Sequence, residues 1–215
     1  MWAGFAITVM LGGIHALLDL TRKFRTALPG PLREVFLIHM EQSIATWLTV
    51  FVTAAVGMLC ISAGIKSARR GWYGVGALFL YLSMDDAVGL HERVGWVIEG
   101  RIGQDGFSFR WIQFMGPFIA VAGVAAFAFL WRRFRRCARG RVYLLMAFGM
   151  LGTALGFEVF EKFLDESPMR LRGFVLAKYS ILLEECCELM APMLLLACMV
   201  GLHEVGRGKL RPDED

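Results

Sequence analysis

The sequence predicts an all-α membrane protein, a polytopic transmembrane helix bundle of about six spans. Of its 215 residues, 57% are hydrophobic, and the mean hydropathy of +0.55 is too high for an ordinary soluble domain. The apolar residues also occur in runs that approach the roughly 20 residues a helix needs to cross about 30 Å of hydrocarbon. The predicted segments cover residues 1–20, 35–65, 72–92, 111–131, 142–163 and 179–203.

The first segment has the length of a signal peptide, but no basic stretch precedes its apolar run. Its basic residues, Arg22, Lys23 and Arg25, follow it instead. We therefore expect a span here, with a re-entrant or interfacial helix as the alternative. Residues 1–206 are predicted to form a single transmembrane helical domain, and residues 207–215 a charged C-terminal tail.

Basic residues predict the orientation of the bundle. Clusters within residues 66–70, 132–141 and 207–211 fall on the same face of a six-span arrangement. Short loops rich in Lys and Arg stay cytoplasmic. The sequence therefore predicts an integral, multi-pass membrane protein with its C-terminus in the cytoplasm. An arginine-rich loop between two spans is a topology signal, so no nucleic-acid partner is expected.

Acidic side chains and histidines concentrate on the opposite face. They close the third segment, close the fifth and open the sixth, and these positions meet on one side because consecutive spans alternate direction. An ionised carboxylate in hydrocarbon costs roughly 2.5 to 3.5 kcal/mol, so the cluster indicates a functional site. The three groups are Asp85, Asp86, His91 and Glu92, then Glu158, Glu161 and Asp165, and finally Glu184, Glu185 and Glu188.

Helical geometry predicts which of these groups share a face. At 100° per residue, Asp85 and Glu92 lie on one face of the third segment, whereas His91 is rotated from Asp85 by roughly 120°. A continuous helix would therefore keep Asp85 and His91 from binding the same ion. The same geometry places Asp86 beside Arg93, where the two side chains could pair.

Two further patterns predict how the helices pack. Gly149, Gly152 and Gly156 line one side of the fifth segment, where a neighbouring helix could approach closely. Trp72 and Trp131 lie at predicted span ends, as in the aromatic belt of a membrane protein.

Carboxylates mixed with one or two imidazoles suit Fe, Zn or Mn. We therefore predict a divalent metal near the non-cytoplasmic face, where an open coordination position would activate water or oxygen for chemistry on a lipid-like substrate. The sequence names neither that substrate nor the oligomeric state. The predicted metal ligands are Asp85, Glu92, His91, Glu158, Glu184, Glu188 and His39. The groups predicted to orient these ligands are Asp86, Glu161 and Gln42.

Three alternatives remain open for the same cluster. The first is a proton- or cation-coupled transporter or channel, in which the acids form a relay for a small cation without a permanent metal. The second is a structural charge cluster, in which nearby Arg and Lys side chains neutralise the acids. The third is a b-type haem protein, for which the chain offers His15, His39, His91 and His203.

Two strings carry a resemblance to known sequences. One is Ser83-Met-Asp-Asp-Ala-Val-Gly-Leu-His-Glu92, and the other is Leu183-Glu-Glu-Cys-Cys-Glu-Leu189. Together they resemble segments of uncharacterised bacterial multi-pass membrane proteins, which have S-x-D-D/E before L-H-E in one span and E-E-x-x-E in a later one. The resemblance covers two spans and implies a multi-pass membrane fold without implying an activity.

Overall fold

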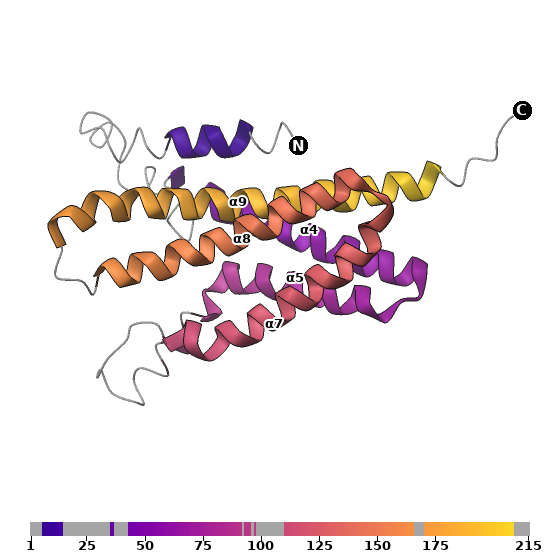
Figure 1. The fold of residues 1–215 in the computed structure, drawn as a ribbon, viewed down its shortest axis with the longest axis horizontal. Helices are drawn as coiled ribbons and strands as arrows, with labels where there is room; N and C mark the ends of the chain where they lie inside the picture. Colours follow the sequence, from indigo (N-terminus) through magenta and orange to yellow (C-terminus); the bar gives the residue numbers. More distant parts are fainter. Residues whose placement is uncertain are drawn as a thin grey trace, which may run out of the picture.

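The computed structural model describes residues 6–14, 35–36, 43–91, 93–95, 97, 110–165 and 170–208. Apart from short turns between helices, these residues are helical and none is in a strand, which confirms the predicted all-α class. Figure 1 shows the long helices running side by side as a bundle. The long helices are α4 (Ile44–Ser67), α5 (Arg70–Val88), α7 (Arg110–Arg133), α8 (Ala138–Asp165) and α9 (Arg170–Gly208). A short 3-10 helix, η1 (Phe134–Arg136), connects α7 to α8.

Three helices are long and apolar enough to cross a membrane: Ile44–Ser67, Phe114–Arg133 and Ala138–Phe157. Only 28%, 11% and 22% of their respective apolar windows are buried inside the protein, so most of this apolar surface faces outward. A helix that exposes apolar side chains in this way needs lipid or another protein around it. The described residues thus support three candidate spans, while the count of six stays a prediction.

α4 and α5 form an antiparallel pair joined by a tight turn (Figure 1). α4 begins after Ser43, whose hydroxyl accepts the Thr46 N–H at 3.2 Å as an N-cap. The two helices approach most closely at two glycines. A Cβ added to Gly57 would lie 3.0 Å from the Gly76 carbonyl oxygen, and one added to Gly76 would lie 2.9 Å from the Gly57 carbonyl oxygen. Larger side chains at either position would push the helices apart.

The predicted glycine contact on α8 is wrong. A Cβ added to Gly149, Gly152 or Gly156 would meet nothing within 4 Å among the described residues, and all three glycines are exposed. These glycines share a helix face, but that face points outward, away from α9, the helix against which α8 packs most extensively. The close backbone approach lies between α4 and α5 instead.

The core joins α4, α5, α7, η1, α8 and α9. Leu130, Phe134 and Leu144 are at most 1% exposed at its centre. Trp72 is 3% exposed, and its ring meets Phe129 edge-on at a centroid distance of 5.2 Å. Trp72 is therefore a core residue, and its predicted place in an aromatic belt is wrong.

The turn between α4 and α5, the η1 segment and the C-terminal half of α9 meet at one end of the bundle (Figure 1). Cys198 donates its thiol hydrogen to the Gly140 carbonyl at 3.3 Å, and the Cys60 Sγ lies 4.0 Å from the Met199 Sδ. These contacts bring the basic clusters within residues 66–70 and 132–141 to the same end.

A further helix, over residues 6–14, packs on the opposite half of the bundle. Its Leu11 is buried with Ala45 of α4 and Leu189 of α9. A Cβ added to Gly12 would lie 3.3 Å from the Cys186 Sγ, so this helix also contacts α9 closely. The rest of segment 1–20 is outside the described residues, and its predicted crossing stays a prediction.

Candidate functional site

The candidate site begins where α5 ends. The helix stops at Val88 because Gly89 adopts a left-handed conformation, with φ 59° and ψ 42°. The Gly89 N–H donates to the Asp85 backbone carbonyl at 2.8 Å, which satisfies one of the last carbonyls of the helix. Glycine reaches this conformation without the steric penalty of a side chain. A short helical turn follows, in which the Arg93 N–H donates to the Gly89 carbonyl at 3.1 Å.

This turn brings His91 onto Asp85. The His91 backbone N–H donates to Asp85 Oδ1 at 2.9 Å, and the ring Nδ1 lies 2.9 Å from Asp85 Oδ2. An ionised carboxylate only accepts, so the imidazole donates from Nδ1, and Nε2 is the basic nitrogen of the neutral ring. The Asp85 side chain is 10% exposed and the His91 side chain 26%. A buried carboxylate therefore fixes the tautomer and orientation of a partly exposed imidazole.

The predicted separation of Asp85 and His91 is wrong. It assumed one continuous helix as far as residue 92, whereas the left-handed Gly89 ends that helix and changes the direction of the chain. The predicted shared face of Asp85 and Glu92 rested on the same assumption, and Glu92 itself lies outside the described residues.

The two aspartates occupy an unfavourable part of α5. Both lie in its last turns, where the negative end of the helix dipole disfavours a carboxylate. Asp85 is compensated by the two N–H donors of His91. The Oδ2 of Asp86 is buried and has no hydrogen-bond partner in the part of the chain that the structure describes.

The predicted pairing of Asp86 with Arg93 is also wrong. The Nε of Arg93 donates to the Val88 carbonyl at 2.9 Å, so the guanidinium caps the end of α5. Once the helix ends at Val88, Arg93 no longer follows the face that carries Asp86.

Contacts of α5 and α9 with α4 show where Asp85 and Glu188 lie along the bundle. Ser83 of α5 donates its hydroxyl to the Val50 carbonyl at 2.8 Å, and Leu189 of α9 packs with Ala45. Asp85 follows Ser83 by two residues, and Glu188 directly precedes Leu189. Both acids therefore lie in the half of the bundle where α4 begins. Within the described residues, no group of three or more His, Cys, Asp or Glu side chains could hold a metal ion.

Of the other predicted ligands, the structure describes only the side chains of Glu184 and Glu188. Glu158 and Glu161 are on α8, but their side chains are outside the described parts, as are His39 and Gln42 altogether. Glu184 and Glu188 are half-buried on α9. The structure shows that Asp85 and His91 contact each other, and the predicted metal-ligand set as a whole stays a prediction.

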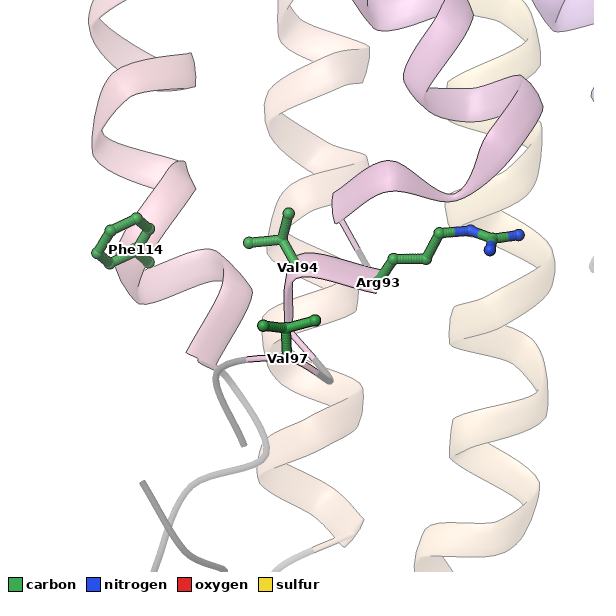
Figure 2. Close-up of a pocket in the computed structure, with 4 residues that line it drawn as sticks. All are labelled: Arg93, Val94, Val97 and Phe114. Carbon is green, nitrogen blue, oxygen red and sulfur yellow. The ribbon is translucent and has the colours of Figure 1, made fainter. Parts of the chain in front are cut away.

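A shallow apolar hollow of about 300 Å³ lies next to this pair along the chain, between the segment after Gly89 and the start of α7. Its lining residues are Arg93, Val94, Val97 and Phe114. In Figure 2 the side chains of Val94 and Val97 face α7, while the Arg93 guanidinium extends the other way. The hollow thus offers hydrocarbon surface, and the Arg93 guanidinium points away from it.

Gly89 is the residue that the sequence interpretation missed. A glycine four residues after an aspartate, at the end of an apolar helical run, is a C-cap signal. Applied to the string from Asp85 to His91, that signal predicts the turn and with it the return of the histidine.

By its fold, this is an all-helical protein with three helices suited to crossing a membrane and a carboxylate–imidazole pair at the end of a fourth. The chain belongs to the family described as Domain of unknown function (DUF8692), whose model matches residues 3–202. The match includes Asp85, Gly89 and His91. No curated protein and no solved structure matches the chain.

Proposed function

We propose that this protein is an integral membrane protein that binds a divalent metal, Fe, Zn or Mn, through His91. The observation that carries the proposal is the double hydrogen bond from His91 to the Asp85 carboxylate. Metal-binding histidines usually donate their other ring N–H to a carboxylate or carbonyl, which fixes the ring and raises its basicity. Nδ1 donates to Asp85, so Nε2 would be the metal ligand.

This geometry changes the role of Asp85. It orients His91 and stabilises the bound form, and the oxygen ligands come from other residues. Glu184 and Glu188 are proposed ligands because α9 passes the same end of α4 as Asp85 does. Glu92, Glu158 and His39 complete the proposed set, and Asp86, Glu161 and Gln42 are proposed to orient it.

The proposed chemistry follows from an open metal position and the adjacent hollow. A divalent metal with such a position polarises bound water or oxygen. The hollow is apolar, and it is lined by Val94 and Val97, a few residues after His91, and by Phe114 of α7. Such a surface suits the hydrocarbon chain of a lipid-like substrate. In this proposal the protein is in a bacterial inner membrane, with the basic end and the C-terminus in the cytoplasm and the acidic end outside.

The test is elemental analysis of detergent-purified protein in four forms: wild type, His91→Gln, Asp85→Asn, and the double variant Glu184→Gln, Glu188→Gln. We expect near-stoichiometric metal in the wild type, little in the His91 and double variants, and a 10- to 100-fold weaker affinity in Asp85→Asn. Tyr73→Phe, at the other end of α5, is the control and should retain metal. Wild-type protein without Fe, Zn or Mn, or equal metal in wild type and His91→Gln, would contradict the proposal.

A second candidate is a proton or cation relay, and Asp86 favours it. A buried carboxylate oxygen with no partner among the described residues, directly after the carboxylate of an Asp–His pair, suits a group that takes up and releases a proton. Flux into reconstituted vesicles separates the two functions. The relay requires flux that Asp86→Asn abolishes, whereas the metal proposal expects no flux in either the wild type or Asp86→Asn.

A further inference from the structure

A basic surface lies at the opposite end of the bundle, between the start of α5 and the end of α7. Phe129 of α7 joins the two helices there, since its ring packs edge-on against Trp72 and fills the space that a Cβ on Gly71 would take. The Arg133 guanidinium stacks 4.9 Å from the centre of the same ring. Arg70 begins α5 directly before Gly71, and Arg133 ends α7, so both arginines lie at this end of the bundle, close in sequence to the contacts of Phe129.

The positive charge of this surface is not balanced within the described residues. Arg70 is exposed, and the Nε of Arg133 is buried without a hydrogen-bond partner among them. Every acidic side chain that the structure describes lies in the last turns of α5 or the first half of α9, toward the other end. A partly exposed guanidinium binds phosphate well, because its planar fork matches two phosphate oxygens.

The depth of the surface indicates where that phosphate comes from. Each candidate span has one end here: Ile44–Ser67 and Phe114–Arg133 finish at this end, and Ala138–Phe157 begins there. Arg133 is the last residue of its span, which places it at the depth of lipid headgroups. Toward the membrane interior, only 11% of the apolar window of Phe114–Arg133 is buried, so this span continues below Arg133 as exposed apolar surface.

We propose that Arg70 and Arg133 bind the phosphate of an anionic phospholipid in the leaflet that contacts this end. The acyl chains lie along the exposed apolar faces below, and the ring of Phe129 holds the Arg133 guanidinium in place. An anionic lipid is favoured over a zwitterionic one because the described part of this surface carries arginines and no acidic side chain. This inference is independent of the metal site and would survive the loss of that proposal.

The experiment is native mass spectrometry of the full chain in a nonionic detergent, with equimolar phosphatidylglycerol and phosphatidylcholine. We expect wild type to retain phosphatidylglycerol about tenfold more than phosphatidylcholine. The double variant Arg70→Gln, Arg133→Gln should reduce this preference at least about fivefold. Arg139→Gln removes an exposed arginine at the same end and should leave the preference unchanged. Inorganic phosphate at the lipid concentration should not displace the lipid.

Three results would overturn the proposal. If the wild type retains the two lipids equally, the proposal is contradicted by the wild-type measurement alone. An equal loss in Arg139→Gln would show diffuse surface charge instead of a site, and displacement by inorganic phosphate would show a site for the free anion. If the double variant does not fold, Arg133→Lys keeps the charge and loses the planar fork. Its preference should still fall, and an unchanged preference would contradict the assignment to Arg133.

Discussion

His91 holds the Asp85 carboxylate with two groups at once, its backbone N–H on Oδ1 and its ring Nδ1 on Oδ2, each at 2.9 Å. The pairing depends on the turn at Gly89, because six residues of continuous helix would carry the imidazole to a different face. The left-handed conformation of Gly89 thus determines whether Asp85 and His91 are separate or in contact, with the carboxylate orienting the imidazole.

Replacing Gly89 tests this dependence. Gly89→Ala places a Cβ in the left-handed region and should lower the free energy of unfolding by about 1 kcal/mol. Gly89→Asn is the matched control, because asparagine tolerates this conformation better, and it should be destabilised less. Thermal unfolding in detergent measures both. Equal stability of Gly89→Ala and wild type would show that the turn does not need a positive φ.

The α4–α5 crossing gives a second prediction. Gly57→Ala and Gly76→Ala each place a methyl group about 3 Å from the opposing helix backbone, and each should be destabilised by about 1 to 3 kcal/mol. Gly74→Ala on α5 meets nothing within 4 Å among the described residues and should be neutral or slightly stabilised. Unfolding of the three variants under one set of conditions makes the comparison. A loss in Gly74→Ala as large as in Gly76→Ala would contradict the close crossing.

The crossing of the membrane by α7 gives a third prediction. Phe118, Val121 and Val124 are 73%, 71% and 69% exposed, so in a membrane they contact lipid. Val121→Arg should make insertion of the segment less favourable by roughly 2.5 to 3.5 kcal/mol, as measured in a translocon insertion assay. Val124→Leu, on the same side, is the control and should insert like the wild type. Unimpaired insertion with Arg at position 121 would place this face against protein or water.

Much of the fold could be predicted because runs of apolar residues are a local property. The segments proposed for residues 35–65, 111–131 and 142–163 each contain most of a helix that the structure finds apolar enough to cross a membrane. The contact between Gly57 and Gly76 could not be predicted, since it depends on how α4 and α5 rotate against each other. The regular glycine spacing on α8 was the more visible pattern, yet it faces outward.

The candidate site was predictable in its residue types and not in its geometry. The acids and the histidine at the end of the third segment are evident from the sequence, but a projection at 100° per residue holds only while the helix continues. Asp85 and His91 were therefore assigned to different faces, although one left-handed residue places them in direct contact. Arg93 was misassigned for the same reason, and it caps the Val88 carbonyl.

The most direct test of the central claim is ¹⁵N NMR of the His91 ring in detergent-solubilised protein, with and without Zn²⁺. We predict an Nδ1-protonated ring without metal, and a large shift of the Nε2 resonance at one equivalent of Zn²⁺ that Asp85→Asn weakens. An Nε2-protonated ring, or an Nε2 resonance that Zn²⁺ leaves unchanged, would contradict the account that Asp85 orients His91 as a metal ligand.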